Sequence, residues 1–565
     1  MKFTSASILA VALLSFQYVE AQVSIIKKRD YPQGYFRSPL GIPPQASGTF
    51  GELRSTHFHA GDDYRTQQRI GLPLFAVADG YVSRVRVQIG GGGNSVYINH
   101  PNGFTSVYLH MHEFNAELAA IVKAKQYEQR RFDVDIPLDR GTVPVKKGDR
   151  IGLSGNTGSS QGPHLHFELR DTKTEAPLNP QLFGLKFPDN LPPVIRGITL
   201  YDLGDEPFNE HTHRRHLALT DKQTLPVNGR FGVGINTVDR HNGTSFNNGV
   251  YSIELLLDGK PVSTVLFEEL SFATSGTINS YIDYPYYVLK KTRVQKSFKD
   301  PNNPINIFHH LQGDGSITLT DQQEHTLTYR VRDVHGNTSS HQFKVRNDSG
   351  YAPAAQPIAG ATLFRFGREN RYTAENVQVV IPPNALYDHL HFTYSQGTLP
   401  KDGYSAVQHV HNRFIPLAES YELKIKPDAT LTEELRPKAI VVDLEGRSHG
   451  GNFQNGWVRT KTRSFGSFYI AVDTVPPTIQ SLNLSEGKDM GGTGRVNFRI
   501  FDDLSGIQSF NGLIDGEWVL MQYDPKTRSL WHVFENNLPK GRHHFRLEVV
   551  DWKHNRAVYE ANFIR

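Results

Sequence analysis

Cysteine is absent from the 565-residue chain. A chain without cysteine has no disulfide framework, no thiolate metal site and no N-terminal cysteine that could carry a lipid. Any metal ion must therefore be held by histidine, aspartate or glutamate. Histidine is abundant, with 25 residues, so the histidines are the side chains to examine first.

Long apolar runs are also scarce. The run at 8–14 follows Lys2 and is too short to span a bilayer as a finished helix. Small residues at Val19 and Ala21 stand at the positions where a signal peptidase cleaves. We therefore expect residues 1–21 to be a signal peptide; an uncleaved N-terminal anchor is the alternative. No later run is long enough for a membrane helix, so the mature chain is expected to be exported and soluble.

Neither sign of charge dominates the chain. The 61 Lys and Arg residues exceed the 57 Asp and Glu residues by a formal charge of +4. So small an excess, without a basic stripe carrying interleaved aromatics, gives no indication of nucleic-acid binding. The length predicts roughly three to five domains, and the 49 glycines and 32 prolines favour many turns and strands.

A segment rich in glycine and serine, 155–168, contains His164 and His166. In a strand, residues i and i+2 point to the same face, so both imidazoles can reach one pocket. The His-x-His pattern alone is weak evidence, because most such pairs lie on solvated strand faces or in loops. It recurs at His57/His59, His110/His112, His211/His213, His389/His391 and His409/His411.

Possible partners upstream distinguish the pair at 164 and 166. His59 and Asp63 lie four residues apart, with Gly61 between them. Two histidines and a carboxylate form a catalytic zinc set that leaves one position open for water.

The segment around these residues, 22–190, reads as a β-rich first domain. Residues 80–87 alternate apolar and polar side chains, as a half-buried strand does, and Asn102-Gly103 is a hairpin signal. A break in this rhythm at about 113–140, with Asn115 as a capping residue, predicts a helical insertion. The insertion is either a wall of a substrate groove or a packing element.

Several motifs of this domain occur together, in order. They are His59-x-Gly-x-Asp63, Ala78-Asp79-Gly80, Asn102-Gly103 followed by Tyr108-Leu109-His110, Lys147-Gly148, and Gly155-Asn156-Thr157-Gly through Gly162-Pro163-His164-Leu165-His166-Phe167-Glu168. This set resembles the M23 metallopeptidases of the lysostaphin and LytM type across most of residues 45–180. The segment 48–54 and the helical insertion resemble long, multi-domain members found in Bacteroidetes-type Gram-negative bacteria.

The resemblance implies roles for five residues. His59, Asp63 and His166 would bind one Zn²⁺ per chain, with no other cofactor. His110 and His164 would flank the open position as catalytic residues, sharing the roles of base and oxyanion stabiliser between them. His57 and His112 are alternatives to His59 and His110, but the family motifs favour the latter two.

The resemblance also implies an activity. We expect a secreted zinc metalloendopeptidase that hydrolyses peptide bonds in peptidoglycan stem peptides or cross-links, in particular the D-Ala–meso-diaminopimelate bond, through a metal-activated water. Its place would be the periplasm or cell envelope of a Gram-negative bacterium, or outside the cell. The alternatives are a catalytically silent domain that binds murein or activates an amidase, and a wall-anchored scaffold or adhesion protein.

From about residue 191 the chain predicts further β domains. Their expected limits are 191–346 (β-sandwich-like), 347–474 (β-rich) and 475–565 (Ig-like β-sandwich). The first and last resemble each other: each begins with Pro-Pro, contains Asp-Gly and ends with a strand and turn. The paired motifs are Pro192-Pro193 with Pro476-Pro477, Asp258-Gly259 with Asp515-Gly516, and 329–337 with 547–555. Wall binding and a spacer role both remain open for these segments.

Overall fold

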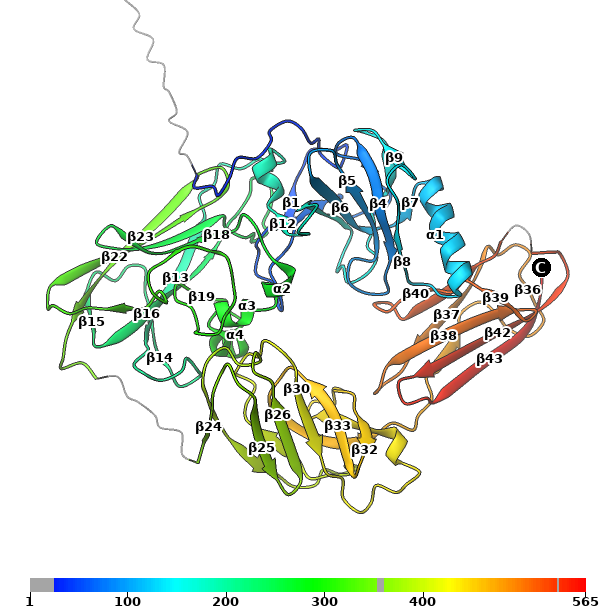
Figure 1. Cartoon of the computed structure of the whole chain (residues 1–565). Coiled ribbons are helices and arrows are strands. Elements are labelled where there is room, and N and C mark those ends of the chain that lie inside the picture. Colours follow the sequence, from blue (N-terminus) through cyan, green and yellow to red (C-terminus); the bar gives the residue numbers. More distant parts are fainter. Residues whose placement is uncertain (1–24, 353–359, 536–537) are drawn as a thin grey trace, which may run out of the picture.

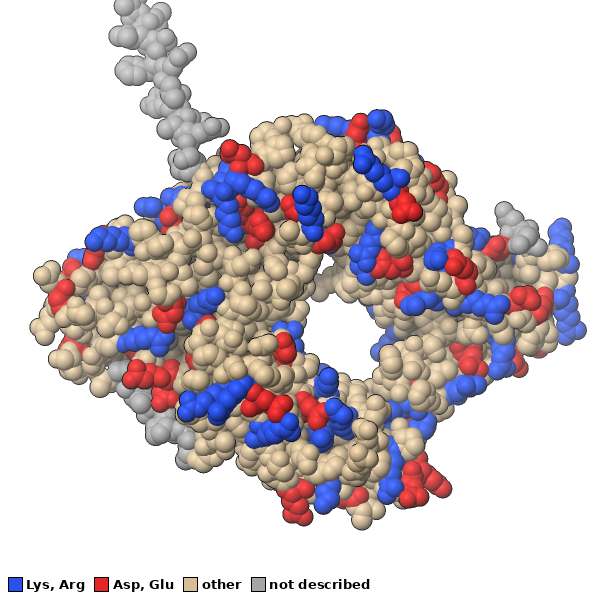
Figure 2. All heavy atoms as spheres, viewed as in Figure 1, with Lys and Arg blue, Asp and Glu red and all other residues tan. Residues whose placement is uncertain are grey.

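The computed structural model describes residues 25–352, 360–535 and 538–565. The predicted signal peptide at 1–21 lies outside these ranges. Within them the chain is mostly β, which confirms the predicted fold class, and no helix combines the length and apolarity that a membrane crossing needs. Four units follow one another, and Figure 1 shows them arranged as a ring. Each has an apolar core, but the first two cores exchange residues: Phe50 and Phe58 pack in the second core, and Leu266 packs in the first. Figure 2 shows the central opening that they surround.

The first unit is built on one antiparallel sheet in the order β1-β2-β11-β6-β5-β4-β8. These strands are β1 (Ala46–Gly48), β2 (Asp62–Arg65), β11 (His164–Asp171), β6 (Phe104–Met111), β5 (Asn94–Asn99), β4 (Gly80–Val87) and β8 (Val134–Pro137). The sheet places β11, late in the unit, between β2 and β6, so three segments distant in sequence become neighbours.

Shorter elements complete the first unit. β12 (Pro177–Leu178) pairs with β11, and β9 (Pro144–Val145) pairs with β4. β3 (Pro73–Phe75), β10 (Arg150–Leu153) and β7 (Glu113–Phe114) form a small second sheet, and η1 (Pro180–Phe183) follows β12.

The predicted helical insertion is present as α1 (Ala116–Gln129). Asn115 caps it by accepting a hydrogen bond from the backbone N–H of Leu118 at 3.0 Å. Leu118 and Val122 are buried in the core of the first unit, so the helix is anchored along one side.

The second unit contains two sheets and three short helices. Its strands are β13 (Val194–Asp202), β14 (His213–Leu217), β15 (Thr224–Val227), β16 (Arg230–Val238), β17 (Ser252–Leu257), β18 (Lys260–Leu266), β19 (Gln295–Lys296), β20 (Phe308–Leu311), β21 (Ile317–Thr318), β22 (Glu324–Arg332) and β23 (Thr338–Asn347). The helices α2 (Phe272–Ser275), α3 (Ile278–Tyr281) and α4 (Tyr284–Lys290) were not predicted.

In their described residues, the third and fourth units are all-β apart from one 3₁₀ turn, η2 (Arg436–Lys438). The third contains β24 (Thr362–Phe364), β25 (Asn370–Ala374), β26 (Val377–Ile381), β27 (Leu390–Phe392), β28 (Tyr394–Gln396), β29 (Gln408–Val410), β30 (Tyr421–Ile425), β31 (Ala439–Asp443), β32 (Asn452–Gln454), β33 (Trp457–Thr462) and β34 (Gly466–Val472). The fourth contains β35 (Thr478–Ser481), β36 (Lys488–Asp489), β37 (Arg495–Phe501), β38 (Ile507–Ile514), β39 (Glu517–Val519), β40 (Gln522–Asp524), β41 (Ser529–Val533), β42 (Arg542–Asp551) and β43 (Arg556–Ile564).

Contacts between α1 and the fourth unit close the ring (Figure 1). Tyr127 donates a hydrogen bond to Glu535, and Lys123 forms an ion pair with the same carboxylate at 2.9 Å. The Tyr127 ring also meets Trp518 edge-on, with 5.2 Å between ring centroids. The inserted helix α1 therefore connects the first unit with the fourth.

Candidate metal centre

The register of β11 brings the predicted site residues together. His166 lies opposite Asp63 of β2 on one side and opposite Leu109 of β6 on the other. This pairing requires a close approach at Gly61, where a Cβ atom would lie 2.2 Å from the carbonyl oxygen of Phe167. Glycine at 61 is thus needed for the strand contact that forms the site.

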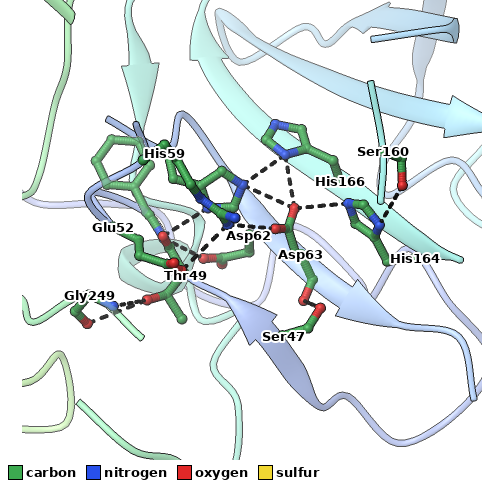
Figure 3. Close-up of polar contacts among 12 residues, drawn as sticks. Ser47, Thr49, Glu52, His59, Asp62, Asp63, Ser160, His164, His166 and Gly249 are labelled. Carbon is green, nitrogen blue, oxygen red and sulfur yellow. Dashed lines mark hydrogen bonds and ion pairs between the residues drawn. The ribbon is translucent and has the colours of Figure 1, made fainter. Parts of the chain in front are cut away.

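His59, Asp63 and His166 form a compact, buried cluster (Figure 3). His59 Nε2 and His166 Nδ1 lie 2.9 Å apart, and each lies 3.0 Å from Asp63 Oδ1. The three residues are 5%, 6% and 8% exposed, respectively. We call them the catalytic cluster, a name that anticipates the role proposed for them. Their donor atoms all point to one position that a metal ion could take.

The outward nitrogen of each histidine is already engaged. His59 Nδ1 lies 2.9 Å from the carbonyl oxygen of Thr49, and His166 Nε2 lies 2.9 Å from Glu168 Oε1. Both partners are acceptors, so these nitrogens carry the protons. The inward nitrogens, His59 Nε2 and His166 Nδ1, then face each other and Asp63 Oδ1, so either a proton on His166 or a metal ion can lie between them.

Electrostatics favour positive charge at this position. Burial alone would lower the pKa of His166, but its bonds to Asp63 and Glu168 raise that pKa to about 9. Burial would raise the pKa of Asp63, yet the neighbouring imidazoles hold it well below its usual value. Arg54 binds the other oxygen of this carboxylate, Oδ2, at 2.8 Å. Asp63 therefore stays ionised and offers one oxygen inward.

His164 and His110 flank the catalytic cluster, with 4.9 Å between their ring centroids. His164 Nε2 lies 3.4 Å from Asp63 Oδ1, while its Nδ1 donates to the carbonyl oxygen of Gly162 at 2.8 Å. His110 Nδ1 donates to the carbonyl oxygen of Thr157 at 2.9 Å. Because Nδ1 of both rings donates its proton to a backbone carbonyl, Nε2 is the nitrogen that can accept a proton.

The backbone at His110 has φ = 61°, in the left-handed region that few non-glycine residues adopt. Such strain often accompanies functional positions. Burial, together with the charges of His166 and His164, lowers the pKa of His110 to about 3. The His110 ring is therefore neutral at neutral pH and can accept a proton.

The other histidine pairs lie elsewhere. His112 is exposed and 3.4 Å from Glu113, and His57 is exposed as well. His213 bonds to Asp202, and His409 bonds to Ser467. Within the described ranges, none of these joins a side-chain group that could hold a metal ion, nor do His211, His389, His391 and His411.

Four supporting residues were not predicted: Thr49, Arg54, Glu168 and Arg170. Glu168 could have been found, because it follows His166 by two positions on the same strand face. Arg170 binds Glu168 Oε2 at 2.6 Å, and together with His166 it holds the pKa of the buried Glu168 at about 2. The sequence carries no comparable signal for the loop residues Thr49 and Arg54.

A cavity of about 560 Å³ lies between the loop 51–53 of the first unit and the second unit. Arg196, Lys291 and Arg293 are among the residues that line it, opposite Glu52. Burial raises the pKa of Glu52 to about 7, against the effect of Arg54. The cavity is thus predominantly basic and borders the loop that carries Arg54.

Comparisons with known proteins agree with this geometry. Residues 57–127 and 139–180 match the model of Peptidase family M23, and residues 361–473 match a Zu5-like domain. An uncharacterized metalloprotease of Haemophilus influenzae is 36% identical over 146 residues, which are 24% of this chain and 25% of that protein. The DD-carboxypeptidase/endopeptidase Mpg of Neisseria meningitidis is 32% identical over 137 residues, 24% and 25% of the two chains.

A further relative is the peptidoglycan DD-endopeptidase ShyA of Vibrio cholerae, 36% identical over 111 residues, 20% of each chain. Among solved structures, the catalytic domain of a prophage-encoded M23 protein of Enterococcus faecalis is 26% identical, covers 27% of this chain and 97% of that one, and has a TM-score of 0.19. The chain spans about a quarter or less of the length of these three relatives. The family match covers the strands that carry the catalytic cluster, and the chain therefore contains a domain of peptidase family M23.

Proposed function

We propose that this protein is an exported zinc metalloendopeptidase that cuts peptide bonds in peptidoglycan stem peptides or cross-links, with the D-Ala–meso-diaminopimelate bond as its substrate. The observation that carries the proposal is the convergence of His59, Asp63 and His166 on one buried position. The names of two relatives, a peptidoglycan DD-endopeptidase and a DD-carboxypeptidase/endopeptidase, support the substrate class.

In this proposal His59 Nε2, His166 Nδ1 and Asp63 Oδ1 hold the zinc ion. When bound, zinc lowers the pKa of a coordinated water and polarises the scissile carbonyl. Thr49 and Glu168 fix the tautomers and orientations of the two imidazoles through their outward nitrogens.

His110 and His164 transfer the protons of the hydrolysis reaction. Each keeps its Nδ1 proton on a backbone carbonyl, so each Nε2 can accept a proton from the attacking water or, once protonated, donate to the oxyanion or leaving amine. The low pKa of His110 keeps that ring neutral before the reaction starts. We assign the pair jointly to these two roles.

The basic cavity supports an acidic substrate. Stem peptides carry free carboxylates, and Arg196, Lys291 and Arg293 could bind them in this cavity. The proposal includes the expected domain limits, which fall after residues 190, 346 and 474. The first unit would be catalytic, and the other three would position it in the cell envelope.

The test is release of soluble muropeptides from sacculi by the chain without residues 1–21. The wild type should release them, His166→Ala should not, and His166→Ala should bind one zinc fewer. His112→Ala is the matched control, since His112 is exposed and close in sequence to the site. Equal release by wild type and His166→Ala would reject the mechanism. Zinc binding at His166 without release by the wild type would favour the silent, murein-binding alternative.

A further inference from the structure

A second group of potential metal ligands lies in the second unit, which the proposed mechanism does not use. Asp239 follows β16 directly, His241 comes two residues later, and Asp189 lies in the segment that enters the unit. One ligand atom from each residue lies within 4.8 Å of the others. His241 Nε2 is 3.2 Å from Asp239 Oδ2 and 4.0 Å from Asp189 Oδ2. We call these three residues the second cluster.

The second cluster is buried but incompletely bonded. The side chains of Asp189, Asp239 and His241 are 0%, 2% and 3% exposed. Among the residues the structure describes, Asp189 Oδ2, Asp239 Oδ1 and His241 Nδ1 have no hydrogen-bond partner. Each buried polar atom left in this state costs about 1–3 kcal/mol. Asp189 Oδ2 is both unpartnered and directed toward the imidazole of His241, which points to a missing ligand between them.

The charge of the surroundings indicates the sign of that ligand. Burial and the nearby charge of Asp239 raise the pKa of Asp189 to about 6. Burial and Asp333 also raise the pKa of Asp239. Asp189, Asp239 and Asp333 thus repel one another in a buried region beside the imidazole of His241, and a divalent cation would offset this repulsion.

The fourth unit contains a similar group of carboxylates, Asp473, Asp502 and Asp551. Comparing it with the second cluster shows which ligand occurs in the second unit alone. Asp189 and Asp473 each stand three residues before a Pro-Pro pair and accept a hydrogen bond from the backbone N–H two residues later. Asp239 and Asp502 each follow a strand, β16 and β37. Asp333, near the second cluster, corresponds to Asp551 in the fourth unit. Each accepts a side-chain hydrogen bond at 2.7 Å from the asparagine four residues later in the chain.

The two units differ at His241. The residue two positions after Asp502 is Leu504, so the fourth unit offers only carboxylates. An imidazole among carboxylates favours zinc-type ions, whereas oxygen-only groups favour calcium.

We propose that Asp189, Asp239 and His241 bind a second divalent cation, Zn²⁺, in the second unit. This site is separate from the catalytic cluster. The two groups share no residue. The ring of Phe187 packs beside His241, with 5.8 Å between centroids, and beside Tyr64 on β2, with 4.9 Å between centroids. The inference stands on the geometry of the second cluster and does not depend on the proposed peptidase activity.

The position of the site suggests what the ion stabilises. Asp239 and Asn248 exchange backbone hydrogen bonds of 2.9 and 2.8 Å, and Gly249 N–H donates to the hydroxyl of Thr49 at 3.1 Å (Figure 3). The carbonyl of the same Thr49 orients His59. A cation on Asp239 would therefore hold the loop 239–249 against the first unit and behind the catalytic cluster.

The test removes the catalytic cluster first. The full mature chain carrying His59→Ala and His166→Ala is stripped with a chelator and titrated with Zn²⁺ alone by calorimetry. It should bind one equivalent, and the wild type should bind two. Adding Asp239→Asn to the double variant should reduce one equivalent to none. Zinc should also raise the melting temperature of the double variant and leave that of the triple variant unchanged.

Asp258→Asn is the matched control. Asp258 is an aspartate of the same unit that bonds to a histidine, His325, at 2.7 Å, but it lies outside the cluster. This variant should keep its zinc. If Asp239→Asn gives no cooperative melting transition, His241→Gln replaces it and should lose the same equivalent. The proposal is overturned if the folded double variant binds no zinc, if the equivalent survives both substitutions, or if the site takes Ca²⁺ but not Zn²⁺.

Discussion

The catalytic cluster and the second cluster contain similar ligands but are supported differently. In the catalytic cluster every outward atom has a protein partner: Thr49 for His59, Glu168 for His166 and Arg54 for Asp63. In the second cluster the corresponding atoms of Asp239 and His241 have none among the described residues. Protein contacts thus orient the catalytic ligands before an ion arrives, whereas the second cluster depends on the ion for its order. The first arrangement suits chemistry, and the second suits structural stabilisation.

Removing a ligand from the catalytic cluster should have the largest effect. Asp63→Asn replaces the buried carboxylate between the two imidazoles with a neutral amide. We expect loss of the catalytic zinc and a fall in muropeptide release on the order of 10³-fold or more, because a bound metal supplies several kcal/mol of transition-state stabilisation. Metal analysis and a sacculus assay measure the two effects.

Because Asp63 is not part of the second cluster, the second cluster of Asp63→Asn should retain one zinc. Asp135→Asn is the control, since Asp135 is a half-exposed partner of Arg84 and lies on β8, which ends the strand order opposite β1 and β2. Activity near the wild-type level in Asp63→Asn would contradict the role given to Asp63.

Weakening an outward contact should have the next largest effect. Glu168→Gln keeps an oxygen that can accept the proton of His166 Nε2 but removes the negative charge. Changes of this kind outside the ligand set cost about 10- to 100-fold in metal affinity or activity, and we expect a loss in that range. Competition with a chromophoric chelator gives the zinc affinity.

Glu175→Gln is the matched control for Glu168→Gln. Glu175 pairs with the same Arg170, at 3.2 Å, but is 55% exposed at its side chain and does not touch His166. Its zinc affinity should stay unchanged. Equal losses in the two variants would mean that Arg170, rather than the His166 contact, governs the effect.

Arg54 should matter less than Glu168, because its side chain is about one-third exposed. Arg54→Lys keeps a positive charge but loses the planar fork that fixes Asp63 Oδ2. A decrease of about tenfold in zinc affinity is expected, at the lower end of the range for outer contacts. Arg84→Lys alters an ion pair with Asp135 through an arginine about as exposed as Arg54, and it should leave the affinity unchanged. No difference between the two variants would remove Arg54 from the support of the site.

The sequence predicted much of the first unit because its signals are local. Alternation identified the strand at 80–87, and Asn115 marked the start of α1. The helix α4 was missed because it is only seven residues long, with Asp283 as its cap inside a β-rich region. Ring closure through Tyr127 and Trp518 was also missed, because it joins side chains almost 400 positions apart with no pattern to connect them.

The candidate ligands could be predicted for a similar reason. His59 and Asp63 have a recognisable spacing, and the structure brings them to His166. Thr49 and Arg54 contribute through the conformation of a loop, which spacing does not reveal. The second cluster was missed because Asp189 and Asp239 lie 50 positions apart and meet only when the second unit folds.

A buried histidine with no carboxylate bonded to its ring should affect the stability of the fold rather than the metal position. His100 is 5% exposed, donates from Nδ1 to the carbonyl oxygen of Asp79 and contacts the hydroxyl of Ser106. Burial lowers the pKa of His100 to about 4, opposite to the rise at His166. The unfolded chain therefore takes up a proton near pH 6.5, before the folded chain does, so stability falls as pH drops from about 6.5 to about 4.

The full loss at His100 amounts to about 3 kcal/mol, since each pKa unit corresponds to about 1.4 kcal/mol. His100→Gln, which has no titrating ring, should remove this part of the pH dependence, and calorimetric unfolding of the metal-free chain at pH 7.5 and 4.5 measures it. His112→Gln, at an exposed position, should retain the wild-type dependence. If His100→Gln loses as much stability between the two pH values as wild type does, burial does not set the charge of this histidine. The opposite pKa shifts of His100 and His166 would then have a cause other than the carboxylates bonded to His166.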